Sequence, residues 1–157
     1  MLGTALGAVV DTGLQAKGQD RILWMERLTE QFHAGVSIGM VAGRRGPGGE
    51  LIKDVVTAET QGSDRSPGFH GLEMAMGLAG MDSPAFGYYA GPAAKITVVA
   101  DGRTVRAQQA VWSEDPSIVL FWFPLKQVKP TSEVSRASAY DSNGRKLPAG
   151  NATFAFG

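Results

Sequence analysis

Cysteine is absent from the 157 residues of this chain. That absence excludes disulfide bridges, thiolate metal sites and cysteine nucleophiles. Histidine is scarce, because only His33 and His70 are present. Neither histidine has a partner at the spacing of a helical metal motif. The sequence therefore predicts no metal, no cofactor and no catalytic residues, and it favours structural roles for both histidines.

Clustered charge and a membrane-length apolar run are also missing. Fifteen lysine and arginine residues balance fifteen aspartate and glutamate residues, so the formal net charge is zero. The densest basic stretches are the pairs Arg44-Arg45 and Arg145-Lys146. A nucleic-acid-binding protein usually needs a clustered basic surface, so we expect no nucleic-acid partner.

Glycine is abundant, with 21 residues, which suits a chain with many turns. Asp101-Gly102 separates two runs rich in β-branched residues and predicts a tight hairpin turn. Residues 141–144, DSNG, predict a second tight turn, and residues 81–84 a third. Eight or nine short strands are predicted, within residues 34–42, 51–59, 69–80, 84–90, 93–101, 104–112, 118–123, 132–140 and 152–156. The fold class is mainly β, an antiparallel β-sandwich that is Ig-like or barrel-like.

One α-helix is predicted before these strands, over Asp20–Phe32. Its apolar residues recur at three- and four-residue spacing, at Ile22, Met25, Leu28 and Phe32. Asp20 is a suitable residue to cap the amino end of such a helix. We expect residues 20–157 to form a single β-sandwich domain that includes this N-terminal helix.

Residues 1–19 are expected to be an apolar N-terminal segment. The stretch 1–10 carries no charge, but it is shorter than the roughly 20 apolar residues that a spanning helix needs. It also lacks the basic start of a signal peptide. Two alternatives remain, a buried or partner-covered first element of the fold, or the residual end of an export or anchor segment. The second alternative implies a membrane tether upstream of residue 1.

Aromatic residues in the second half supply the candidate binding residues, which are Trp122, Tyr88, Tyr89 and Trp112. Phe121 and Phe123 share one face of their predicted strand, so Trp122 takes the opposite face. Either both faces are covered, or the second face carries an exposed aromatic patch that binds a partner or a glycan.

The covered alternative leads to a specific expectation for Trp122. The predicted helix has an apolar stripe that needs a surface to bury against. We expect this stripe to cover Trp122 through Ile22, Met25 or Leu28, because an exposed indole forgoes a large burial energy.

A hydrolase is the alternative function. It would use His70 with a nearby carboxylate, such as Asp64 or Asp82. This reaction requires His70 in a concave pocket within hydrogen-bond reach of that carboxylate. The adjacent carboxylates Glu114-Asp115 are interpreted as a solvent-facing turn, because neighbouring residues there point apart.

Four features follow one another from residue 86, the last of them reaching a few residues beyond 140: the aromatic-glycine entry FGYYAG, a strand–DGR–strand hairpin, an aromatic FWF strand, and AYD followed three residues later by glycine. In this order they resemble a module of exported or membrane-anchored proteins of high-GC Gram-positive bacteria. The resemblance implies an extracytoplasmic β domain, secreted or membrane-anchored, and it implies no active-site residues.

The favoured function is therefore a non-enzymatic extracytoplasmic binding or scaffold module of a cell-envelope or secreted assembly. Its expected partner is a protein or a cell-envelope component. A structural subunit of a larger particle is a further alternative, and the sequence leaves the oligomeric state open.

Overall fold

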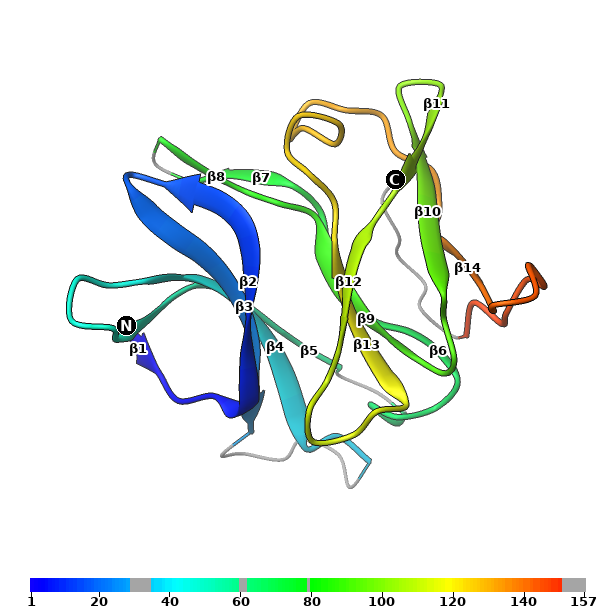
Figure 1. Cartoon of the computed structure of the whole chain (residues 1–157), viewed down its shortest axis with the longest axis horizontal. Helices are drawn as coiled ribbons and strands as arrows, with labels where there is room; N and C mark the ends of the chain where they lie inside the picture. Colours follow the sequence, from blue (N-terminus) through cyan, green and yellow to red (C-terminus); the bar gives the residue numbers. More distant parts are fainter. Residues whose placement is uncertain (29–34, 60–61, 79, 151–157) are drawn as a thin grey trace.

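The computed structural model describes residues 1–28, 35–59, 62–78 and 80–150. In these residues the chain is mainly β, with fourteen strands arranged in antiparallel sheets and no helix (Figure 1). Within the same residues, no helix has the length and apolar character needed to cross a membrane.

The first five strands form the N-terminal sheet. They are β1 (Leu2–Gly3), β2 (Leu6–Ala16), β3 (Gln19–Arg27), β4 (Ile38–Arg45) and β5 (Leu51–Ala58). Their order in the sheet is β1-β5-β4-β3-β2. The two edge strands, β1 and β2, are consecutive in the chain, so the sheet must curl to bring the chain from one edge to the other (Figure 1). Residues 1–19 therefore belong to this sheet.

The helix predicted over Asp20–Phe32 is wrong where the structure describes it, because residues 19–27 form strand β3. Ile22 and Trp24 are buried on one face of β3, while Leu23 and Met25 are buried on the other. A central strand that is covered on both faces has apolar residues at nearly every position. Some of those residues then fall at the three- and four-residue spacing of a helix. Residues 29–32 of the predicted helix lie outside the described residues.

The remaining strands form two further sheets and one small hairpin. The central sheet has the order β12-β13-β9-β6, with bounds Gln108–Val111, Ile118–Trp122, Phe86–Ala90 and Gly68–Glu73. The outer sheet has the order β11-β10-β14, with bounds Arg103–Arg106, Lys95–Ala100 and Ser138–Tyr140. The hairpin pairs β7 (Met76–Leu78) with β8 (Met81–Ser83).

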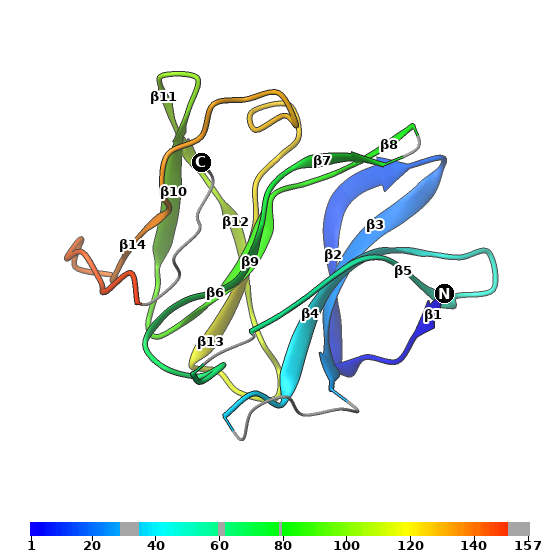
Figure 2. The same ribbon diagram turned by 180° about the vertical axis from the view of Figure 1, so that it is seen from behind.

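The central sheet is buried on both faces. One face packs with the N-terminal sheet in a cluster that contains Leu23, Met40, Tyr88, Leu120 and Trp122. The other face packs with the outer sheet in a cluster that contains Phe69, Tyr89, Ile96, Val98 and Phe121. Both views of the ribbon show the central strands between the other two sheets (Figures 1 and 2).

The predicted strands and turns agree with the structure in most places. Asp101 and Gly102 form the β10–β11 turn, with φ angles of 50° and 79°. The second turn is confirmed by the bond from the Asp141 N–H to the Arg145 carbonyl at 2.9 Å. The turn predicted at 81–84 is wrong, because residues 81–83 form β8, a strand too short to show a periodic pattern.

The strand predicted at 132–140 is shorter than expected. Only Ser138–Tyr140 forms a strand, while Val134 makes an isolated bridge to Ala100. The strand predicted at 152–156 lies outside the described residues.

Candidate functional site

The four aromatic residues predicted to bind a partner lie in the core. Trp122 is 6% exposed, Trp112 and Tyr88 are each 2% exposed, and Tyr89 is 1% exposed. Trp122 faces away from Phe121 and Phe123, as the strand pattern predicts, and it packs with Leu23 and Met25. The covering element is thus strand β3 rather than a helix, and the four residues form no exposed aromatic patch.

The polar atoms of three of these aromatic residues bind the chain itself. The Tyr88 hydroxyl donates to the Asp64 carbonyl at 2.8 Å, and the Tyr89 hydroxyl donates to the Pro148 carbonyl at 2.5 Å. The Trp112 indole donates to the Leu6 carbonyl at 3.1 Å. These bonds fasten loops and β2 to the central sheet, which is a structural role.

His70 is buried and both of its ring nitrogens are engaged. Nδ1 lies 2.9 Å from Glu59 Oε1, and Nε2 lies 2.6 Å from the Ser66 carbonyl oxygen. Both contacts are to oxygen acceptors, an arrangement that suits the doubly protonated ring. Burial alone would lower the pKa of His70, but the bonds to Glu59 and Ser66 outweigh it and raise the pKa above its ordinary value. The ring also stacks on Tyr88, with centroids 5.1 Å apart.

The carboxylates proposed as catalytic partners of His70 do not hydrogen-bond to it. Asp64 instead accepts from the backbone N–H groups of Ser37, at 2.5 Å, and Ile38, at 3.0 Å, where β4 begins. Asp82 lies on the β7–β8 hairpin. His70 therefore links the end of β5 to β6, with neither nitrogen free to take a proton from a substrate. His33 lies outside the described residues.

No group of three or more metal-ligating side chains is placed to hold an ion in residues 1–28, 35–59, 62–78 and 80–150.

The surface does contain a cleft, where one strand passes from the outer sheet to the central sheet. β11 pairs with β10, and after Ala107 the chain continues as β12, which pairs with β13. The Ala107 N–H still bonds to the Ile96 carbonyl of β10 at 2.8 Å. Beyond that point the two sheets separate, and a cleft of about 370 Å³ opens, lined by Ala94, Arg106, Ala107, Gln108 and Gln109. The cleft is shallow and more open than enclosed, so it would hold a group of a larger partner and not enclose a whole ligand.

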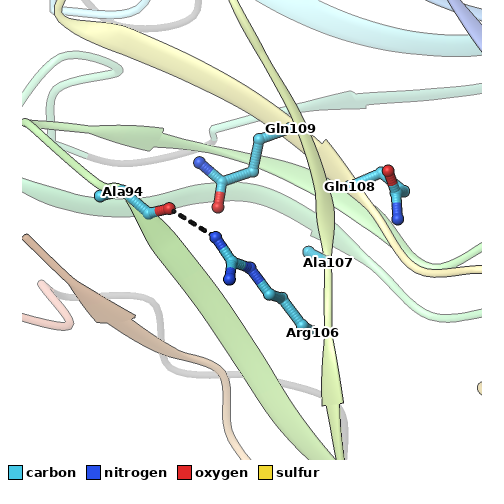
Figure 3. A pocket seen from close by; sticks show the side chains of 5 residues that line it. All are labelled: Ala94, Arg106, Ala107, Gln108 and Gln109. Atoms are coloured by element: carbon cyan, nitrogen blue, oxygen red, sulfur yellow. Dashed lines mark hydrogen bonds between the residues drawn. The ribbon is translucent and has the colours of Figure 1, made fainter. Parts of the chain in front are cut away.

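Two side chains give this cleft its chemistry. The Gln109 Nε2 donates to the Ala93 carbonyl at 3.1 Å, which leaves Oε1 buried without a hydrogen-bond partner. Arg106 is exposed and donates from Nη2 to the Ala94 carbonyl at 3.3 Å. Figure 3 shows the Gln109 oxygen directed toward the Arg106 side of the cleft, while Gln108 lies away from Ala94.

The cleft thus has a buried, unpaired hydrogen-bond acceptor in its wall, beside a guanidinium group. A buried acceptor without a donor costs roughly 1–3 kcal/mol, so a ligand donor that reaches Oε1 recovers that free energy. The guanidinium favours a carboxylate or another anionic oxygen. A ligand with an N–H or O–H group next to a carboxylate fits both.

Sequence reasoning did not single out Arg106 or Gln109. Both lie within a predicted strand, where polar residues normally indicate a solvent-facing side. The cleft exists because the strand changes sheets at Ala107, and no local sequence pattern reports that change.

No family model matches the chain, and neither the curated proteins nor the solved structures contain a match to it.

Proposed function

We propose that this chain is a non-enzymatic extracytoplasmic binding module that holds a polar group of a protein or cell-envelope partner in the Arg106–Gln109 cleft. The observation that carries the proposal is the Gln109 carbonyl oxygen, buried without a donor beside an arginine. An unsatisfied buried polar atom is rare in native proteins and calls for an explanation. A ligand donor supplies one.

We also propose that the fold is a β-sandwich, Ig-like or barrel-like, in which the cleft lies at the crossing between two layers. The two apolar clusters on opposite faces of the central sheet support this description.

The extracytoplasmic location rests on the resemblance of residues 86–140 to modules of exported proteins. It is tested by treating intact source cells with protease and probing for the chain with an antibody. Cleavage in intact cells supports the location, while protection until the membrane is broken contradicts it.

The hydrolase alternative has less support. A general base needs a nitrogen free to accept a proton from the substrate or its water. Both His70 nitrogens are engaged by fixed oxygen atoms, Glu59 Oε1 and the Ser66 carbonyl oxygen, so neither nitrogen is free in this arrangement.

The binding proposal is tested by titrating two small probes into the ¹⁵N-labelled chain and following the backbone amide signals. N-acetylglycinate carries a carboxylate next to an amide N–H, and N-acetylglycinamide is the matched probe without charge. We expect the charged probe to shift the signals of Ala94 and residues 106–109 more strongly than those of other segments. Shifts centred elsewhere, or none at tens of millimolar probe, would contradict the proposal.

Arg103→Ala is the matched control for Arg106→Ala in this titration. Arg103 lies on the same strand and is exposed, but it does not line the cleft. The proposal predicts that the Arg106 variant loses the response to N-acetylglycinate and that the Arg103 variant keeps it.

A further inference from the structure

One edge of β12 is open along the cleft. β12 is the terminal strand of the central sheet and pairs only with β13 among the described strands. The Trp112 N–H donates to the Ile118 carbonyl at 2.9 Å, so the backbone groups of Trp112 face β13. Backbone groups alternate along an antiparallel strand, so Ala110 and Gln108 also face β13. Gln109 and Val111 therefore direct their N–H and C=O groups to the open edge.

The open edge and the cleft lie on the same side of the strand. Ala107 directs its N–H to Ile96 of β10, and Gln109, two residues later, faces the same way. On that side β10 begins at Lys95, next to the cleft residue Ala94. A strand added to β12 would thus occupy the space where β10 no longer accompanies the chain. Val111, at this edge, is 59% exposed.

The longest edge strand of the described sheets, β2, is protected against such pairing. Its pairing with β3 has register shifts after Leu6 and after Asp11. Gly7 and Gly13 there have φ angles of 80° and 74°. Bulges and irregular backbone twist an edge away from a further strand. The pairing of β12 with β13 has no such shift.

Charge decides what kind of strand fits. Arg106 makes no ion pair with any described carboxylate, and the only described bond of its side chain is to the Ala94 carbonyl. Gln109 Oε1, beside it, needs a donor. An extended peptide supplies backbone N–H groups, and an acidic residue in it supplies the carboxylate.

We infer that the ligand of this cleft is an extended acidic peptide segment of a partner protein, which adds to the open edge of β12. The inference rests on the proposed function and specifies its ligand. Backbone hydrogen bonds to Gln109 and Val111 provide the affinity, and the carboxylate on Arg106 provides the selectivity, as in other cases of strand addition.

The experiment uses acetylated, amidated hexapeptides as probes and the full chain as the receptor. The parent peptide alternates threonine and glutamate, and the reference peptide alternates threonine and glutamine. Two further versions of the parent carry N-methyl groups on alternate amides, one on the first set and one on the second. In a strand, alternate amides face opposite edges, so only one set can bond to β12. Binding is followed by amide shifts, and amide hydrogen exchange is measured at Gln109 and Val111.

We expect the parent peptide to bind about fivefold more tightly than the glutamine reference, and Arg106→Ala to remove this difference while Arg103→Ala keeps it. We expect one N-methylated peptide to lose binding and the other to keep it. We also expect amide hydrogen exchange at Gln109 and Val111 to slow when the parent peptide is bound.

Equal binding of both methylated versions, or unchanged exchange at Gln109 and Val111, would overturn strand addition. If N-acetylglycinate still shifts the cleft signals in that case, and Arg106→Ala removes these shifts, the cleft itself remains a binding site. Failure of both the peptides and N-acetylglycinate would overturn the inference and the proposed function together.

Discussion

The side-chain amide of Gln109 donates to the carbonyl oxygen of Ala93 at 3.1 Å. This bond fixes the orientation of the amide, because only the nitrogen end can donate to a carbonyl. The oxygen of the amide therefore points toward the side of the cleft where Arg106 lies. The polarity of the site follows from a contact between two segments, residues 91–94 and β12, that are brought together by the crossing of the sheets.

The buried imidazolium of His70 makes the stability of the fold depend on pH. Its pKa is raised in the folded chain, so its contribution is complete below about pH 6.5, the ordinary value for histidine. That contribution is lost as the pH rises through the folded-state pKa. We expect the stability difference between the natural chain and His70→Phe to shrink by about 1 kcal/mol between pH 6 and pH 9, measured by urea unfolding.

The comparison controls for the other histidine, since His33 is present in both proteins. A difference that stays constant from pH 6 to pH 9 would show that folding does not raise the pKa of His70.

The N-terminal sheet contains a buried carboxylate, Asp54, that forms ion pairs with two arginines. Arg21 is fully buried and lies 3.2 Å from Asp54, while Arg44 lies 3.0 Å from the same carboxylate oxygen. Asp54→Asn leaves two guanidinium groups uncompensated and should cost about 3–5 kcal/mol. Arg21→Met leaves Asp54 paired with Arg44, and it also removes two buried nitrogens, Nε and Nη2, that have no partner in the described structure. We expect it to cost less than about 1.5 kcal/mol. Chemical denaturation of both variants checks the order, and equal losses would contradict it.

Trp122 joins the central sheet to β3. Trp122→Ala should cost about 3–5 kcal/mol, as for other large-to-small changes in a core. Val56→Ala is the control, because Val56 is 52% exposed. Should the alanine variant fail to fold, Trp122→Phe is expected to fold with a smaller loss. A normal melting temperature for Trp122→Ala would show that the indole is not covered by β3.

Gly102 tests the β10–β11 hairpin. A Cβ added at Gly102 would meet no atom within 4 Å, so the cost of a substitution comes from its φ of 79° alone. Gly102→Val should cost more than about 1 kcal/mol, since β-branched residues disfavour positive φ. Gly102→Asn should cost less, because asparagine tolerates this region. Thermal melting of the two variants checks this, and equal losses would point to a cause other than φ.

Local signals account for what the sequence predicts correctly. Asp101-Gly102 specifies its hairpin by backbone preference alone, and the alternation of Phe121, Trp122 and Phe123 follows from strand geometry. The segment around Trp24 has helical spacing although it is a strand, because distant segments bury both of its faces and make it apolar throughout. The cleft was not predicted for a related reason, since Arg106 and Gln109 gain their roles from a change of sheet at Ala107.

The dissociation constant of N-acetylglycinate tests the central claim most directly, compared between the natural chain and Gln109→Met. Methionine keeps the length of the side chain and removes both the unsatisfied oxygen and the nitrogen that bonds to Ala93, so the amide signals of Ala93 and Ala94 in the free variant are compared with those of the natural chain. The account predicts that Gln109→Met weakens binding about tenfold, as expected for the loss of one hydrogen bond, while Arg103→Ala leaves it unchanged. Equal dissociation constants for the natural chain and Gln109→Met would contradict the claim that this oxygen receives the ligand.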